Sequence, residues 1–300
     1  MTGNIAPDPG DFTLRSDHAT LALMGDKKPF DRIGYWSELK LEIIRKYAAA
    51  YSKIMSRQVA IRGYGYIDAF AGPGVHVSRR TGDLVAGSPL NALSIQPPFS
   101  EYHFVDINPE KAAHLRQLVS QYFPDRDSIW VHQGDSNVIL PTHVFPRFRY
   151  TDYKRALCFL DPYRLDVDWG LLSAAGSSRS IELFMNCAIM DANRNVLWRR
   201  SDAVGEAARA RLTRVWGNED WRQVAYIEGP GLFGPEYSKA SGSRIAEAFR
   251  ARLREGAGFP HVSQPLPMRI STGAVLYYIY FATHNATAAR IVESIFRKYG

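Results

Sequence analysis

The chain contains very little cysteine and no pattern of metal-binding residues. Its 300 residues include two cysteines, Cys158 and Cys187, and each stands alone in an apolar stretch. They form no CxxC or Cys/His pair, and the eight histidines show no metal-ligand spacing. We therefore expect two reduced core thiols, with no structural zinc, no iron–sulfur cluster and no other bound metal.

Long hydrophobic runs and a secretory leader are also missing from the sequence. No stretch approaches the ~18 apolar residues of a membrane helix. The longest apolar run, residues 273–282, has the length of a buried strand. The N-terminus lacks the basic-then-apolar order of a signal peptide. These absences predict a cytoplasmic protein with no membrane partner.

The charge balance is basic. The chain is 46% hydrophobic and 22% charged, which is ordinary for a globular protein, and its formal net charge is +7. Basic residues gather in two stretches, 32–62 and 194–214. Solvated helix faces would account for each stretch alone, but together they favour a polyanionic partner such as nucleic acid.

Apolar segments of strand length alternate with amphipathic helical segments along the chain. This order predicts an α/β fold with a Rossmann-like, doubly wound, mostly parallel sheet. We expect an irregular arm over residues 1–30 and one domain over 31–300. A helical insertion over about 190–262, broken by a loop near 228–235, would precede the last strands. The predicted strands are 64–69, 101–106, 129–132, 157–160, 181–186 and 275–283, and the clearest helices are 35–55, 109–122, 241–253 and 286–299.

A glycine turn follows the first predicted strand. The apolar run reaches Asp68 and Phe70 and then breaks at Gly72–Pro73–Gly74. Glycines at a strand end let the backbone approach a ligand closely. A dinucleotide fingerprint needs a third glycine, but Val77 stands at that position. The preceding acidic residue and the Phe favour S-adenosylmethionine, and an ordinary strand-to-helix turn is the alternative.

Carboxylates also end the second and third predicted strands. Asp106 can accept both hydroxyls of a ribose. It can also cap the following helix, although Asn108 suits that role better. Asp135, in Gly134–Asp135–Ser136, can accept the adenine amine, or it can be an ordinary turn residue. Because parallel strands present their carboxyl ends at one edge of a sheet, these side chains are expected to share a site.

The fourth and fifth predicted strands end in candidate acceptor-side residues. Asp161–Pro162–Tyr163 follows the fourth, where Asp161 can accept a hydrogen bond from an amine and Tyr163 can stack on a base. A strand-ending turn with a half-buried Tyr is the alternative. Asn186 ends the fifth strand and can present its amide to a substrate or be a satisfied core residue.

Arg79 and Arg80 lie in a segment of about fifteen residues between the glycine turn and the next helix. Unstructured loops of ~12–15 residues are uncommon unless they are functional. Two arginines there can hold a phosphate through bidentate hydrogen bonds, or they can belong to a solvated loop. We therefore include Arg79 and Arg80, with Asn186, as predicted substrate-binding residues.

Several of these segments together resemble one family, the three-Cys-motif partner proteins (TcmP). The resemblance spans roughly residues 35–299 and implies a fold similar to class I S-adenosylmethionine-dependent methyltransferases. It also implies a separate partner with a three-cysteine motif like that of radical-SAM enzymes. The segments that carry it are Tyr66–Gly74, Gly87–Leu93, Gly134–Asn137, Phe159–Pro162 and Tyr277–His284.

The first of these segments is also similar to the first motif of DNA and RNA base methyltransferases. The resemblance therefore implies S-adenosylmethionine as the cofactor. Catalysis is predicted at Asp161, Pro162 and Tyr163, although amino-methyltransferases usually have two prolines after the acidic residue and this chain has one. The predicted cofactor-binding residues are Asp68, Phe70, Ala71, Gly72, Pro73, Gly74, Asp106, Ile107, Gly134, Asp135 and Ser136.

The sequence therefore predicts a methyltransferase that acts on nucleic acid together with the three-cysteine protein. A partner subunit that has the fold, binds nucleotide or nucleic acid and performs no chemistry is the alternative. A nucleotide-dependent oxidoreductase fits less well, because the third glycine is missing.

Overall fold

A computed structural model of the chain describes residues 30–162, 164–187, 206–231, 234–269 and 273–299. The expected N-terminal arm, apart from residue 30, lies outside these ranges, as does Tyr163. The backbone contacts divide the chain into unit 1, Met1–Ser136, and unit 2, Asn137–Gly300.

Unit 1 contains a long helix, α2, whose bounds match the predicted helix 35–55. The helix forms because apolar residues recur along one face, and that face buries Leu41, Ile44, Tyr47 and Tyr51. Its elements are β1 (Arg32–Ile33), α2 (Tyr35–Met55), β2 (Gly63–Asp68), β3 (Val75–Ser78), β4 (Leu84–Ala86), α3 (Ser88–Leu93), β5 (Glu101–Asp106), α4 (Pro109–Tyr122) and β6 (Ile129–Gln133).

The central strands of unit 1 are parallel and occur in the order β2, β5, β6. Asp68 at the end of β2 is opposite Phe104, and Asp106 at the end of β5 is opposite Gln133. Both α3 and α4 pack against these strands. The carboxyl ends of the three strands therefore lie together, as the alternating sequence pattern predicts.

The segment that carries Arg79 and Arg80 is a β-hairpin, so the expectation of an unstructured loop was wrong. Strands β3 and β4 pair antiparallel, and β1 joins β3 in parallel. Gly82, with φ of +79°, donates its N–H to the Ser78 carbonyl at 2.9 Å and closes the turn. The short strands VHVS and LVA form through this pairing, which local composition did not indicate.

Unit 2 contains the remaining elements. Their bounds are α5 (Ser136–Ile139, starting at the last residue of unit 1), η1 (Leu140–Val144), η2 (Phe145–Arg147), η3 (Tyr150–Asp152), β7 (Lys154–Leu160), α6 (Trp169–Ser178), β8 (Ile181–Cys187), α8 (Glu206–Trp216), α9 (Trp221–Ala225), β9 (Tyr226–Gly231), β10 (Gly234–Lys239), α10 (Gly242–Glu255), β11 (His261–Val262), β12 (Leu266–Arg269), β13 (Val275–Thr283) and α11 (Ala286–Phe296).

The sheet of unit 2 is mixed. Strands β7 and β8 are parallel, and both are almost wholly buried. Strand β13 runs antiparallel to β8 and also pairs antiparallel with β11 and β12. The helices α6, α10 and α11 pack on these strands. The predicted last strand, 275–283, is thus present as β13, and β12 pairs with it.

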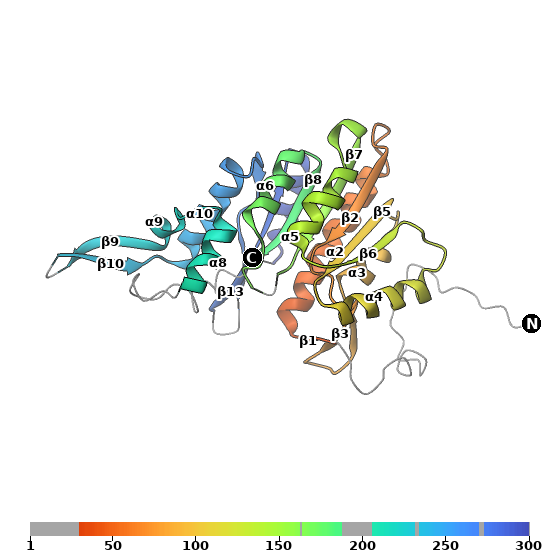
Figure 1. The fold of residues 1–300 in the computed structure, drawn as a ribbon, viewed down its shortest axis with the longest axis horizontal. Coiled ribbons are helices and arrows are strands. Elements are labelled where there is room, and N and C mark those ends of the chain that lie inside the picture. The colour runs from red at the N-terminus through yellow and green to blue at the C-terminus, as the bar shows by residue number, and fades with distance from the viewer. Residues whose placement is uncertain (1–29, 163, 188–205, 232–233, 270–272, 300) are drawn as a thin grey trace, which may run out of the picture. The chain divides into compact units, whose positions relative to one another are not determined.

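The break in the insertion is a second β-hairpin, where the sequence predicted a loop. Strands β9 and β10 pair antiparallel from Tyr226 opposite Lys239 to Gly231 opposite Gly234 (Figure 1). Glycine and proline in both strands resemble loop composition, but the cross-strand ladder imposes strand geometry on them.

The predicted fold class is confirmed. Strands β2, β5 and β6 are parallel, as are β7 and β8; antiparallel pairing occurs at β13 and in the two hairpins. Helices flank the strands, as in Rossmann-like α/β proteins. None of the described helices is long and apolar enough to cross a membrane.

Candidate functional site

The glycine turn of unit 1 has a backbone that other residues would strain. Gly72 has φ of +66° and Gly74 has φ of +86°, in the region that favours glycine. A Cβ on Gly74 would also lie 2.8 Å from Leu115 Cδ1 of α4. Gly74 is therefore needed both for its conformation and for the close approach of α4.

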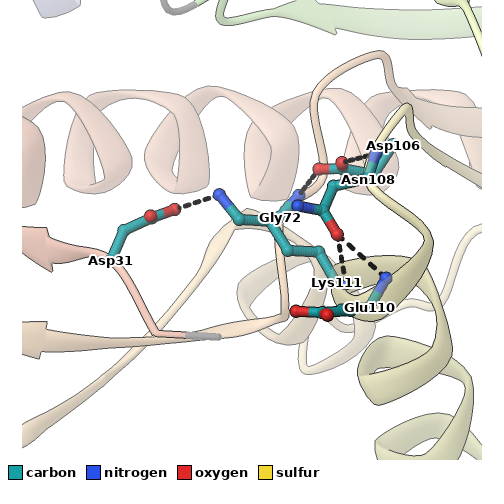
Figure 2. A network of polar contacts seen from close by, with 6 residues as sticks. All are labelled: Asp31, Gly72, Asp106, Asn108, Glu110 and Lys111. Atoms are coloured by element: carbon teal, nitrogen blue, oxygen red, sulfur yellow. Dashed lines mark hydrogen bonds and ion pairs between the residues drawn. The ribbon is translucent and has the colours of Figure 1, made fainter. Parts of the chain in front are cut away.

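Hydrogen bonds join this turn to the end of β5. The Gly72 N–H donates to Asp106 Oδ2 at 2.8 Å, and the Ala71 N–H donates to the Val105 carbonyl at 2.9 Å. Asp106 Oδ1 accepts from the Asn108 N–H at 2.8 Å. A single carboxylate thus holds two backbone segments in place (Figure 2).

The helix that follows Asp106 is capped by Asn108. Its Oδ1 accepts from the Glu110 N–H at 2.9 Å and from the Lys111 N–H at 3.2 Å. Lys111 Nζ bonds to Asp31 Oδ2 at 2.7 Å (Figure 2). The expectation that Asn108 suits the cap better than Asp106 is confirmed, so the remaining lone pairs of Asp106 are not used for capping the first turn.

The end of β6 joins the same network. The Gly134 N–H donates to the Asp106 carbonyl at 3.0 Å, and the Ser136 hydroxyl donates to the Ala69 carbonyl. Asp135 is exposed. The ends of β2, β5 and β6 are therefore connected directly, and we call these residues, Asp68–Gly74, Asp106–Ile107 and Gly134–Ser136, the carboxyl-edge site.

The carboxyl-edge site has a buried part and an accessible part. Asp68 is fully buried, and its Oδ1 accepts from the Phe70 N–H at 3.2 Å, so it shapes the turn. Asp106 is half-buried, Asp135 is exposed, and Ile107 exposes 70% of its surface, which is unusual for an isoleucine. Carboxylate acceptors beside an exposed aliphatic side chain suit a ligand with hydroxyls, amines and an apolar ring.

A histidine that the sequence reasoning missed supports the turn. His114 of α4 places Nδ1 2.9 Å from the Pro73 carbonyl. It lies forty-one positions from Pro73, and only the packing of α4 brings the two together. The local sequence around His114 carries no signal of this contact.

The predicted acceptor-side residues of unit 2 form a second polar cluster. Asn186 Nδ2 donates to Asp161 Oδ1 at 2.8 Å. Asn186 is buried, and its Oδ1 has no hydrogen-bond partner among the described residues. Pro162 is buried after Asp161, and Tyr163 lies outside the described residues. The adjacency of β7 and β8 thus brings two of the predicted residues into contact.

Tyr277 of β13 belongs to this cluster and was not predicted. The pKa of Tyr277 is raised above its ordinary value, mainly by burial and to a smaller extent by the negative charge of Asp161. Its hydroxyl therefore stays protonated and can donate a hydrogen bond. The antiparallel register that pairs Ile279 with Asn186 places Tyr277 near the end of β8, and local sequence carries no signal of that register. We call Asp161, Asn186 and Tyr277 the unit 2 polar cluster.

The other predicted residues are in different surroundings. Arg79 and Arg80 are exposed in the turn of the β3–β4 hairpin. Cys158 and Cys187 are buried free thiols, as expected, and burial raises the pKa of Cys187 to about 12. That pKa keeps the thiol protonated, so it is not a nucleophile at neutral pH. The described residues hold no group of three or more His, Cys, Asp or Glu suited to a metal.

Comparisons by sequence and by structure gave different results. No protein-family model matches the chain, and no curated protein matches it by sequence. The structure is similar to a Legionella pneumophila protein of family DUF519, with a TM-score of 0.50 and 10% identity, covering 86% of this chain and 91% of that one. At this identity, the match shows a shared fold alone.

Two methyltransferase structures are also similar at lower scores. Trm1 of Pyrococcus horikoshii, solved with S-adenosyl-L-methionine, has a TM-score of 0.46 and 12% identity over 90% of this chain and 60% of Trm1. A Clostridium acetobutylicum S-adenosylmethionine-dependent methyltransferase has a TM-score of 0.41 and 8% identity over 82% of this chain and 92% of that one.

Proposed function

We propose that the chain is an S-adenosylmethionine-dependent methyltransferase that acts on nucleic acid. The observation that carries the proposal is the Gly72–Gly74 turn, whose N–H at Gly72 is fixed on the Asp106 carboxylate at 2.8 Å. Because Gly72 and Gly74 have no side chains, a ligand can approach the backbone of the turn closely, beside a carboxylate that retains lone pairs. Both features suit a nucleoside with a charged amino-acid tail.

Each part of the carboxyl-edge site has a role in this proposal. Asp106 would accept the ribose hydroxyls, Asp135 the adenine amine, and Ile107 would cover the adenine ring. The turn from Phe70 to Gly74 would pass beside the methionine portion. When bound, the cofactor supplies an electrophilic methyl group, and the protein contributes orientation and electrostatics.

The unit 2 polar cluster supplies the candidate acceptor chemistry. Asp161 accepts a hydrogen bond from Asn186, the Asn186 side-chain oxygen, unpartnered among the described residues, can accept one, and the protonated Tyr277 hydroxyl can donate one. An amine donates to the first two groups, which keeps its nitrogen lone pair directed away from them. Tyr163 would contribute stacking, and Pro162 would fix the backbone between them.

Calorimetric titration with S-adenosylmethionine tests the cofactor part. We expect the wild type to bind, and Asp106→Ala to bind at least about tenfold more weakly because it loses charge-assisted hydrogen bonds. Asn108→Ala is the matched control. It destabilises the same β5–α4 connection by removing the α4 cap, and it leaves the Asp106 carboxylate in place. No binding by the wild type, or equal loss in both variants, would contradict the proposal.

Methyl transfer tests the acceptor part and separates catalysis from binding alone. The assay uses tritiated cofactor with total RNA and, separately, genomic DNA. We expect Asp161→Ala to lose transfer and keep its affinity for S-adenosylmethionine. A non-catalytic subunit, which the single proline after Asp161 favours, predicts no transfer by the wild type to either substrate, with or without a co-expressed three-cysteine protein.

The three-cysteine radical-SAM-like partner is part of the same proposal. It rests on the sequence resemblance, and co-expression tests it. Size-exclusion chromatography should give a stable complex of the two chains. Separate elution of both proteins at micromolar concentration would contradict the proposal of this partner.

A further inference from the structure

A pocket of about 540 Å³ lies in unit 2 where α9, β9 and the start of α10 meet. Its walls carry both charged and apolar side chains, and none of them belongs to the unit 2 polar cluster. The volume falls within the range of ~300–1,000 Å³ that small-molecule sites occupy. The lining residues are Trp221, Arg222, Gln223, Tyr226, Ile227, Glu228 and Arg244.

Polar contacts join the residues of one wall of this pocket. Trp221 Nε1 donates to Thr213 Oγ1 at 3.0 Å, and the Thr213 hydroxyl donates to Glu219 Oε1 at 2.6 Å. Glu219 also accepts from the Arg222 guanidinium. The Arg222 Cζ lies 5.1 Å from the Trp221 ring centroid. These contacts place the Arg222 guanidinium beside the Trp221 indole, and a guanidinium plane is a stacking surface for a base.

The other wall offers a second cation and an apolar surface. Arg244 is exposed on the first turn of α10, and its guanidinium has no carboxylate partner among the described residues. Ile227 exposes 38% of its surface beside the buried Tyr226. Burial raises the pKa of Tyr226, so its hydroxyl remains a donor. Phosphate binding at Arg244 and apolar contact at Ile227 can thus occur in one ligand.

The carboxylate of Glu228, which also lines the pocket, restricts the kind of ligand that fits. Glu228 would repel a ligand that carries only negative charge, but its carboxylate accepts hydrogen bonds from ribose hydroxyls or an exocyclic amine. Gln223 adds an amide that both donates and accepts. A ligand that combines phosphate, a planar base and donor groups fits this set, and a nucleotide is such a ligand.

We propose that this pocket binds a nucleotide unit of a single-stranded nucleic acid. The phosphate would meet Arg244, the base would lie on Arg222 and Ile227, and Glu228 would accept from the sugar or base. In a duplex, the bases are stacked and paired and do not enter a pocket of this size. The proposal deepens the proposed function by naming the form of its nucleic-acid substrate, and it rests on that function for this purpose.

Fluorescence anisotropy with a labelled RNA strand of about 12 nucleotides tests the pocket. We expect Arg244→Ala to weaken binding about tenfold and to lower the salt dependence by about one phosphate contact. Arg254→Ala is the matched control, since it removes the same charge from an exposed position on the same helix. We expect it to change affinity less than about twofold. Equal effects of both variants, or no effect of either, would overturn the proposal.

Ile227→Asp provides a second variant, because it places a negative charge in the pocket at a half-exposed position. We expect it to abolish strand binding while its thermal melting curve stays cooperative. Ile227→Val should bind as the wild type does. Retained binding by the aspartate variant, or equal binding of a duplex of the same sequence, would contradict a single-strand pocket.

Two further experiments are needed. One distinguishes a nucleic-acid strand from a free nucleotide as the ligand, and the other distinguishes failure of the pocket proposal from failure of the proposed function. Unlabelled uridine monophosphate should displace the strand only at millimolar concentration; displacement at micromolar concentration would assign the pocket to free nucleotides instead. S-adenosylmethionine titration of Arg244→Ala should match the wild type. If the wild type binds no S-adenosylmethionine but binds the strand through Arg244, the proposed function fails and the pocket stands; the reverse pattern removes the pocket alone.

Discussion

The carboxyl-edge site of unit 1 and the polar cluster of unit 2 are built in different ways. In unit 1, backbone N–H groups of Gly72 and Asn108 are fixed on one carboxylate. In unit 2, two side chains hold each other, Asn186 to Asp161 at 2.8 Å, and Asn186 Oδ1 is left without a partner among the described residues.

This difference suggests different tasks for the two sites. In the first site, one carboxylate holds the backbone N–H groups of two segments in place. A side-chain pair with one unused acceptor is costly to bury and gains its compensation when a donor arrives. Under the proposed function, the first arrangement would hold the cofactor and the second would meet the methyl acceptor.

The largest expected effect comes from filling the glycine turn. Gly74→Ala adds a methyl group 2.8 Å from Leu115 Cδ1 at a φ of +86°. We expect it to lower the free energy of unfolding by about 3 kcal/mol, from backbone strain plus overpacking. Urea denaturation measures it. Gly82→Ala has a similar φ of +79° with no neighbour within 4 Å and should cost about 1 kcal/mol. Equal losses would show that packing against α4 adds nothing.

The next effect compares the two polar sites directly. Asp106→Ala leaves the Gly72 and Asn108 N–H groups without their acceptor, and we expect it to cost about 2 kcal/mol of stability. Asn186→Leu removes a buried oxygen that lacks a partner among the described residues, which favours stability, and also removes the Nδ2 hydrogen bond to Asp161, which opposes it. Because the two effects oppose each other, we expect a loss of about 1 kcal/mol or less. Methyl transfer should nonetheless fall in Asn186→Leu. A strongly destabilised Asn186→Leu would identify Asn186 as a structural residue.

A smaller effect concerns alkaline pH. The pKa of Tyr277 is higher in the folded state than its unfolded value of 10.0. Below that pH the hydroxyl is protonated in both states, and its contribution to the free energy of unfolding is fully present. Above that value, the unfolded state releases its proton first, so stability falls as pH rises. Tyr277→Phe should flatten part of this fall in denaturation series above pH 10.0. An unchanged slope would mean that Tyr277 ionises normally.

The smallest effect is at Cys187. Its pKa of about 12 makes the thiol unreactive at neutral pH. Iodoacetamide at pH about 8 should leave it unmodified in the folded protein, and should alkylate it after denaturation in urea, as intact-mass spectrometry will show. Rapid labelling of the folded protein would indicate that the end of β8 opens readily.

Several elements were predictable because their signals are local. The bounds of α2, α4, β5 and β13 match the predicted ranges, since periodicity and caps lie within each segment. The two hairpins were missed because strand pairing between VHVS and LVA, or across the glycines and prolines of β9 and β10, is not encoded in either strand alone.

The sequence by itself determined the order of elements and the residues at the strand ends, because each depends on composition within a few positions. The tertiary structure decided which groups meet. It brought the Asp106 carboxylate to the Gly72 N–H and the Asn186 amide to Asp161. It also brought Tyr277 close enough to Asp161 for the charge to raise its pKa. These contacts depend on register and on strands far apart in the chain, and the free energy that selects them comes from packing the whole sheet.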